Sequence, residues 1–233
     1  MVQLAPSIYA ADYYSLGEQM KVMEEEGISI LHLDVMDGQF VPGFSFGPEF
    51  IAKLRPHSRQ HFDVHLMTQQ PQNLIRQCVE SGADTILLHW EAFEDEKSLL
   101  NAVESIHNFE KKAGIVLNPE TELSALTPDL WKKADKLQLM TTRPGRKGQS
   151  FLTSSLERFR QAKLTAEQLD VQTELQADGG VNLSNIQQLI ASGAETFVVG
   201  NGLFTGKLRE NIKAYQAVLT EGRAGDEAVF YRD

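Results

Sequence analysis

Short apolar runs rich in Val, Ile and Leu alternate along the chain with longer segments whose apolar residues recur at helical spacing. This alternation is typical of repeated βαβ units, in which buried parallel strands are joined by helices. The apolar runs predict eight strands, at residues 2–9, 30–36, 60–66, 85–89, 113–118, 136–140, 173–178 and 196–200. Helical spacing predicts helices at residues 15–26, 71–81, 96–110, 152–167 and 184–191, three of them ended by Gly27, Gly82 and Gly193.

Eight βα units within 233 residues predict an α/β protein with one domain, a (β/α)8 TIM barrel over residues 1–221. A doubly wound sheet is the alternative. It is disfavoured because no Gly-x-Gly-x-x-Gly motif follows the first predicted strand. Residues 222–233 are polar and are expected to form a loose C-terminal tail.

Two predicted strands carry a histidine and an aspartate on the same face. His32 and Asp34 are two residues apart in one strand, as are Asp63 and His65 in the next, so each pair points to one side. Unpaired polar groups are costly in an apolar interior, and two such pairs therefore predict a metal site. Imidazole and carboxylate ligands suit Zn²⁺, Mn²⁺, Fe²⁺ or Co²⁺ better than Mg²⁺.

Polar and sulfur-containing residues gather where the predicted strands end. Function in TIM barrels resides at the C-terminal ends of the strands, so these residues are the candidates for chemistry. In chain order they are Ser7, His32, Asp34, Met36, His65, Met67, His89, Glu91, Asn118, Met140, Asp178, Gly200 and Asn201.

Glycine-bearing loops follow the last three predicted strands. Gly179 and Gly180 open the loop after the seventh strand, and Gly200 precedes Asn201 just before a predicted helix. Backbone N–H groups in such loops, and helix N-termini, attract anions. The loop at residues 143–150 adds glycines and three cations. Three such loops in consecutive units predict a phosphorylated ligand.

Taken together, these motifs resemble the ribulose-phosphate 3-epimerase family. The matching segments are residues 32–38, 40–42, 46–48, 63–67, 144–145, 148–151 and 178–182, and the likeness runs from Pro6 to Phe204. The resemblance implies a metal-dependent (β/α)8 isomerase that interconverts D-ribulose 5-phosphate and D-xylulose 5-phosphate through an enediolate.

The same resemblance implies specific roles for the candidate residues. His32, Asp34, His65 and Asp178 would hold one divalent metal ion, and Asp34 and Asp178 would be the two acid/base groups. Inversion at carbon needs one such group on each face, because a single group returning the proton to the same side regenerates the starting isomer. The implied substrate-binding residues are Ser7, Met36, Met67, Met140, Gly148, Gly179, Gly180, Gly200 and Asn201.

The chain departs from the family pattern at three places. The usual Pro-Gly-Phe-Gly-Gly-Gln of the loop after strand six has Arg146 and Lys147 in place of Phe and Gly. Asn201 stands where Ser is common, and Gln39 where His is usual. If Lys147 occupies a left-handed position, the exchange costs about 1 kcal/mol. None of these residues belongs to the implied metal set, so the differences concern the phosphate site and substrate choice.

Two other functions remain open at this stage. A related ketose phosphate such as D-allulose 6-phosphate would use the same chemistry, and the length of the pocket would decide between the substrates. A sugar-phosphate-binding barrel without turnover is the alternative from another class, suggested by the altered loop. A lyase or synthase is disfavoured because no convincing Lys stands at a predicted strand end.

Composition limits the classes of molecule that the protein is expected to bind. The net charge of -10 and the pI near 5.1 argue against nucleic-acid or membrane partners. Cys78 is the single cysteine, so no internal disulfide is possible. The sequence has no signal peptide or apolar span, which predicts a cytoplasmic protein. Phe44 and Phe46 suggest a lid or a subunit contact in a homo-oligomer.

Overall fold

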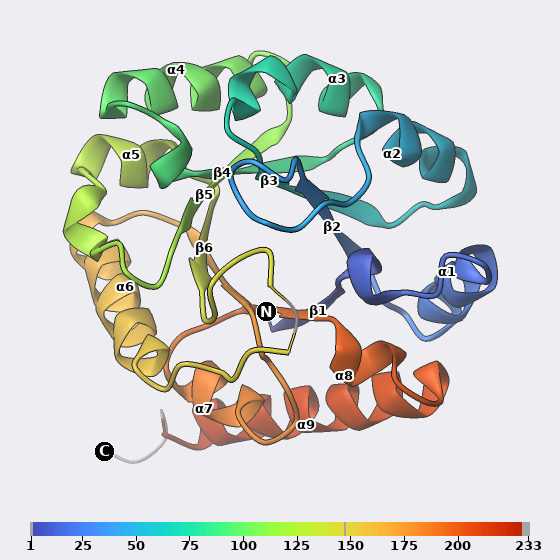
Figure 1. The fold of residues 1–233 in the computed structure, drawn as a ribbon. Helices are drawn as coiled ribbons and strands as arrows, with labels where there is room; N and C mark the ends of the chain where they lie inside the picture. Colours follow the sequence, from blue (N-terminus) through green and yellow to red (C-terminus); the bar gives the residue numbers. More distant parts are fainter. Residues whose placement is uncertain (1, 147, 230–233) are drawn as a thin grey trace.

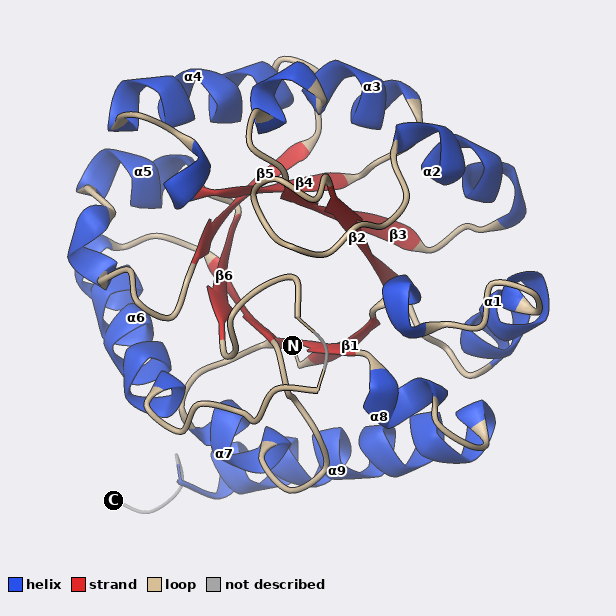
Figure 2. Cartoon of the chain, in the orientation of Figure 1, coloured by secondary structure: helices blue, strands red, loops and turns tan. Residues whose placement is uncertain are grey.

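The protein is a barrel of parallel strands surrounded by helices, as the computed structural model of residues 2–146 and 148–229 shows (Figures 1 and 2). The strands are β1 (Gln3–Pro6), β2 (Ile30–Met36), β3 (His61–Met67), β4 (Thr85–His89), β5 (Lys112–Leu117), β6 (Lys136–Met140), β7 (Glu174–Asp178) and β8 (Thr196–Val199). All eight predicted strands are present, three with the predicted bounds. The (β/α)8 prediction is therefore confirmed.

The strands follow one another around the barrel in sequence order. The sheet order is β1-β8-β7-β6-β5-β4-β3-β2, and every pair is parallel. A parallel bridge between Ser7 and His32 joins the two edge strands and nearly closes the barrel. The C-terminal ends of all strands consequently open on one face, where the loop between β6 and α6 crosses the mouth (Figure 1).

The helices form the outer layer. They are α1 (Leu16–Glu25), α2 (Pro48–Leu54), α3 (Ile75–Glu80), α4 (Glu96–His107), α5 (Pro128–Lys133), α6 (Ser155–Leu169), α7 (Ile186–Ala191), α8 (Asn201–Phe204) and α9 (Leu208–Val229). Gly27, Gly82 and Gly193 all have positive φ just after α1, α3 and α7. They end these helices as expected, since glycine adopts the left-handed conformation without strain.

Two predicted elements break into shorter pieces. The first strand ends at Pro6 because a 3₁₀ turn (Ile8–Ala10) begins directly after Ser7. The helix expected at residues 71–81 starts as a 3₁₀ turn (Pro71–Asn73) and becomes α-helical only at Ile75.

The C-terminal segment differs from its prediction. Helix α9 runs to Val229, so residues 222–229 are helical and not a loose tail, while residues 230–233 lie outside the described part. Extending an existing helix costs less than starting one, and Ala, Glu and Arg in this segment are good helix formers. None of the helices in the described residues is both long and apolar enough to span a membrane.

Strand β2 shows how the sequence positions the site. Leu31, Leu33 and Val35 are 0–3% exposed and belong to the main hydrophobic core. The alternate residues His32 and Asp34 take part in a polar network within the barrel. The strand is thus buried on both faces, apolar toward the helices and polar toward the barrel axis.

Candidate active site

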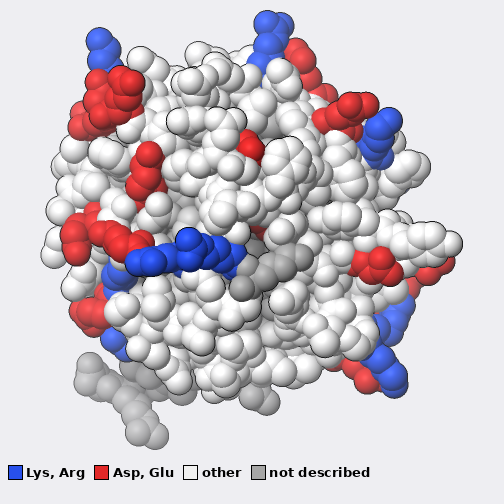
Figure 3. Space-filling model, in the orientation of Figure 1, with Lys and Arg blue, Asp and Glu red and all other residues white. Residues whose placement is uncertain are grey.

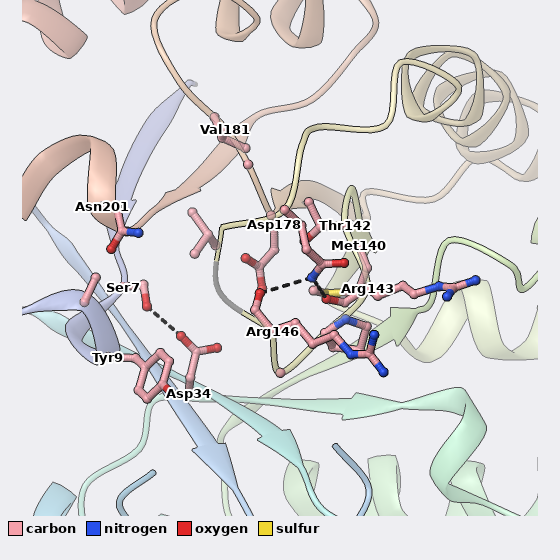
Figure 4. Close-up of a pocket in the computed structure, with 18 of the residues that line it drawn as sticks. Ser7, Tyr9, Asp34, Met140, Thr142, Arg143, Arg146, Asp178, Val181 and Asn201 are labelled. Carbon is pink, nitrogen blue, oxygen red and sulfur yellow. Dashed lines mark hydrogen bonds between the residues drawn. The ribbon is translucent and has the colours of Figure 1, made fainter. Parts of the chain in front are cut away.

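A cavity of about 340 Å³ opens at the C-terminal ends of the strands. The two candidate acid/base residues, Asp34 from β2 and Asp178 from β7, approach it from different sides (Figure 4). Every residue expected to bind substrate lies on its wall: Ser7, Met36, Met67, Met140, Gly148, Gly179, Gly180, Gly200 and Asn201.

The four candidate metal ligands meet beneath this cavity. One ligand atom from each of His32, Asp34, His65 and Asp178 lies within 4.8 Å of the others. His32 Nε2 is 3.4 Å from Asp34 Oδ1, 3.4 Å from His65 Nδ1 and 3.7 Å from Asp178 Oδ2. His65 Nδ1 is 3.2 Å from Asp34 Oδ1 and 3.4 Å from Asp178 Oδ2.

These distances match the coordination sphere of a divalent ion. Ligand atoms about 2.0–2.1 Å from a tetrahedral zinc ion are about 3.3–3.4 Å from one another. The donor set of two imidazoles and two carboxylates also balances a charge of +2 and suits a borderline transition metal. The residues present therefore fit a divalent metal ion.

Protons on the histidines and negative charge on the carboxylates stabilise each other in this cluster. Burial disfavours the charged form of His32, but Asp34 and Asp63 outweigh it and raise the pKa of His32 to about 10. Burial likewise opposes ionisation of Asp34, yet His32 and His65 hold the pKa of Asp34 below its ordinary value. A metal ion would replace these protons as the compensating positive charge.

Register places a second carboxylate behind His32. Asp63 lies opposite His32 in the β2–β3 pairing, and its Oδ2 is 3.1 Å from His32 Nδ1. Burial opposes the ionisation of Asp63, but Lys136 and His32 overcome it and lower the pKa of Asp63. Lys136 Nζ is 3.3 Å from Asp63 Oδ1. An ionised Asp63 accepts the Nδ1 proton of His32 and leaves His32 Nε2 facing the other ligands.

Two buried glutamines connect this ion pair to Asp178. Lys136 donates to Gln176 Oε1 at 2.8 Å, and Gln176 Nε2 donates to Gln138 Oε1 at 2.7 Å. Gln138 Nε2 then donates to Asp178 Oδ2 at 2.8 Å. Because lysine can only donate, the direction of the whole chain is determined at its first member.

Behind His65 lie a second histidine and a glutamate, in place of the single carboxylate behind His32. Its Nε2 lies 2.8 Å from Nε2 of His89, whose Nδ1 lies 3.2 Å from Oε2 of Glu91. Burial lowers the pKa of His89 to about 4, so this ring is neutral. Glu91 Oε1 accepts hydrogen bonds from the backbone N–H of Asn118, at 2.7 Å, and from the hydroxyl of Thr121.

The loops after β6, β7 and β8 form the remaining wall of the cavity. Gly179 has φ +115° and Gly180 φ +65°, both in the left-handed region. A Cβ on Gly179 would lie 2.2 Å from Oγ1 of Thr142, so only glycine fits there. Helix α8 after Gly200 is a single turn of four residues. Its dipole is correspondingly small, and backbone N–H groups are the main anion donors in these loops.

Two arginines of the β6–α6 loop also line the cavity, in a chain of net charge -10. Lys and Arg side chains are visible near the middle of this face (Figure 3). Arg143 is exposed and pairs with Glu120 at 2.7 Å, and Arg146 is exposed. Lys147, the other unusual residue of this loop, lies outside the described residues.

Sequence reasoning overlooked the polar residues on β6 and β7. Lys136 and Gln138 in β6 and Gln176 in β7 are all buried. They alternate with Leu or Ala in the same way as His32 and Asp34 do in β2. That alternation was an available signal for further inward-facing polar residues. The pocket also includes Tyr9, which lies in the 3₁₀ turn after β1 and was not among the candidate residues.

Comparisons with known proteins identify relatives over most of the chain. The model of the "Ribulose-phosphate 3 epimerase family" matches residues 3–204. Ribulose-phosphate 3-epimerase of Aquifex aeolicus is 38% identical over 207 residues, covering 89% of this chain and 91% of the relative. The chloroplastic ribulose-5-phosphate-3-epimerase of Arabidopsis thaliana is 36% identical over 215 residues, covering 92% and 76%.

Solved structures with the same fold are more distant in sequence. A 3-hexulose-6-phosphate synthase superposes with a TM-score of 0.70 at 15% identity, covering 93% of this chain and 99% of that one. The 3-keto-L-gulonate-6-phosphate decarboxylase of Vibrio cholerae gives a TM-score of 0.68 at 13% identity, covering 94% and 98%. At these identities the likeness concerns the barrel fold alone.

Proposed function

Since the chain belongs to the ribulose-phosphate 3-epimerase family and is an isomerase that interconverts D-ribulose 5-phosphate and D-xylulose 5-phosphate, we propose that Asp34 and Asp178 are its two acid/base groups. The observation that carries this proposal is their placement on different sides of one cavity, at 7% and 9% exposure (Figure 4). Asp34 removes the proton from C3 on one face of the substrate, and protonated Asp178 delivers a proton to the other. In the reverse direction the roles are exchanged.

Each carboxylate has one oxygen on the side of the histidines, and further contacts with the protein orient both groups. In Asp34, Oδ1 faces His65, while Oδ2 accepts a 2.6 Å hydrogen bond from the hydroxyl of Ser7. In Asp178, Oδ2 faces His65 and accepts from Gln138, which leaves Oδ1 for the substrate. These contacts lock both side chains in the orientation that proton transfer requires.

His32, Asp34, His65 and Asp178 hold one divalent ion, which we assign to Zn²⁺, Mn²⁺, Fe²⁺ or Co²⁺ from the donor set. When bound, this ion supplies positive charge that offsets the negative charge of the enediolate. The protein contributes a dry environment, in which this attraction between opposite charges is stronger than in water. Met36, Met67 and Met140 line the cavity with polarizable side chains that exclude water.

The phosphate of the substrate binds at the glycine-bearing loops. Gly148, Gly179, Gly180 and Gly200 line the cavity, and their backbone N–H groups are the donors that we assign to it. Asn201 adds a side-chain amide at the same wall (Figure 4). Backbone N–H groups of such loops commonly bind phosphate in TIM barrels, at the loops after strands seven and eight.

An assay of metal-reconstituted protein with D-ribulose 5-phosphate, run beside D-allulose 6-phosphate, tests the substrate assignment. We expect epimerisation of the pentulose phosphate. Turnover of the hexulose phosphate alone would change the substrate while leaving the chemistry intact. No turnover of either by metal-loaded protein would favour a binding role. The converged ligand set argues against that role, because a binding protein has no need of two buried carboxylates in its pocket.

The expected cytoplasmic location and homo-oligomeric state remain predictions. Size-exclusion chromatography with light scattering would measure the oligomeric state directly.

A further inference from the structure

The two histidines of the candidate metal centre are supported by different groups. His32 Nδ1 faces the carboxylate of Asp63 directly, at 3.1 Å. His65 has no carboxylate behind it among the described residues, and its Nε2 instead meets another imidazole, His89, at 2.8 Å. Two imidazole nitrogens this close require one to donate and the other to accept, so the proton positions on His65 and His89 are coupled.

Glu91 determines which nitrogen donates. A carboxylate only accepts, so the 3.2 Å contact between Glu91 Oε2 and His89 Nδ1 places a proton on Nδ1 of His89. His89 is fully buried and its Nε2 faces an imidazole, so with its proton on Nδ1 the ring carries a lone pair on Nε2. His65 must then donate from Nε2. When a divalent ion takes the place of the second proton on His65, its Nδ1 is left as a lone pair on the side of Asp34 and Asp178.

We propose that Glu91 and His89 are positioning residues that hold His65 in the tautomer whose Nδ1 can bind the divalent ion. This inference rests on the proposed function, because it assumes that His65 is a ligand. Groups that orient a ligating histidine through its other nitrogen commonly change metal affinity about 10- to 100-fold when they are removed. Glu91 acts here through an intervening imidazole.

The tautomers can be read directly from the Zn²⁺-loaded protein by long-range ¹H–¹⁵N NMR spectroscopy of its histidines. We expect His89 to be protonated at Nδ1 alone and His65 to be protonated at Nε2, with Nδ1 of His65 bound to zinc. A proton on Nε2 of His89, or coordination of zinc by Nε2 of His65, would overturn the proposal.

Glu91→Gln should reverse the direction of the hydrogen bonds that run from Glu91 through His89 to His65, with almost no change in side-chain volume. The backbone N–H of Asn118 can only donate, so the amide oxygen must occupy the position of Glu91 Oε1 and the NH₂ group must face His89. His89 then accepts at Nδ1 and donates from Nε2. This forces the proton of His65 onto Nδ1, where it blocks the metal.

We therefore expect Zn²⁺ affinity, measured by competition with a chelator, to fall about 10- to 100-fold in Glu91→Gln. Glu104→Gln is the matched control, because Glu104 is 53% exposed on α4 and pairs only with Lys133 among the described residues. It should bind Zn²⁺ as the wild type does.

The outcomes separate this proposal from the proposed function. If the wild-type protein binds none of Zn²⁺, Mn²⁺, Fe²⁺ and Co²⁺, both fail. If the wild type binds Zn²⁺ and turns over substrate while Glu91→Gln binds Zn²⁺ equally tightly, only the positioning role of Glu91 and His89 fails. Should Glu91→Gln not fold, as judged by circular dichroism, the tautomers of the wild-type protein decide the question alone.

Discussion

The metal and acid/base centre and the phosphate-binding wall lie in one cavity but are built differently. The centre consists of side chains on β2, β3 and β7, which are 0–9% exposed and locked by hydrogen bonds to neighbouring strands. The phosphate wall consists of loops whose groups are largely backbone N–H, with Arg146 and Gly148 exposed. The first region depends on side-chain identity and the second on backbone shape.

This contrast explains where the chain departs from the family pattern. Arg146 and Asn201 line the phosphate wall, and Gln39 lies in the loop after β2, whereas His32 and Asp34 conform to the pattern. A backbone N–H group is present whichever side chain its residue carries. Loop residues can therefore change without losing the donor, provided that the required φ angle is preserved.

The largest expected effect is on kcat, from substitutions in the metal and acid/base centre. Asp34→Asn and Asp178→Asn should each lower kcat by about 10³-fold or more, because each removes one proton-transfer group and one metal ligand. Each variant, reloaded with metal to measured stoichiometry, should still exchange the C3 hydrogen of one epimer with deuterium from solvent. The two variants should act on opposite epimers.

Asp129→Asn, at an exposed position on α5, is the matched control and should retain full activity. Exchange of both epimers by a single variant would contradict the assignment of one carboxylate to each face. That result would indicate another acid/base group in the cavity.

The next largest effect is on the free energy of unfolding, through the ion pair of Lys136 and Asp63 that lies behind His32. Lys136→Met leaves the fully buried carboxylate of Asp63 without its lysine partner, and removing one member of a buried ion pair costs about 3–5 kcal/mol. We expect the free energy of unfolding in urea to fall by this amount. Lys132→Met, exposed on α5, should change it little. Equal stability of the two variants would show that Asp63 is not charged.

A change in the phosphate wall should affect substrate binding and leave the chemical step alone. Gly180→Ala places a side chain at φ +65°, with its Cβ 3.0 Å from the backbone nitrogen of Phe151. A strain of about 1.4 kcal/mol in the bound loop corresponds to a tenfold rise in KM, with kcat nearly unchanged.

Gly206→Ala controls for the strain itself. Gly206 also has positive φ, +83°, but it lies outside the cavity and has free space for a Cβ. It should lose a similar amount of stability with no change in KM. A fall in kcat for Gly180→Ala would mean that the wall and the centre are not separable as described.

The smallest expected effect concerns the unusual cation of the β6–α6 loop. Arg146→Ala should raise KM about two- to threefold at low ionic strength and have no effect at about 0.5 M salt, because an exposed charge is screened by solvent ions. Arg160→Ala, 53% exposed on α6, should leave KM unchanged at both salt concentrations. A large effect that persists in salt would place Arg146 in direct contact with the phosphate.

Much of this architecture could be predicted from local patterns. Three strands have their predicted bounds, because β-branched and Leu-rich runs between turn residues identify buried parallel strands. Boundaries were less accurate where the chain enters 3₁₀ turns, as after Ser7 and at Pro71. The helical character of residues 222–229 was missed because the segment is polar and shows no clear helical spacing of apolar residues.

By itself, the sequence determined that β2 and β3 each point a histidine and an aspartate into the barrel, because alternation along a strand is a local property. Only the tertiary structure decided what each of these residues does. Asp34 and Asp63 are equivalent in pattern, yet register places Asp63 against His32 and Lys136 and directs Asp34 into the cavity. The support of His65 by His89 and Glu91 was likewise decided by the pairing of β3 with β4. Register and barrel closure arise from contacts between distant segments, and no local pattern contains them.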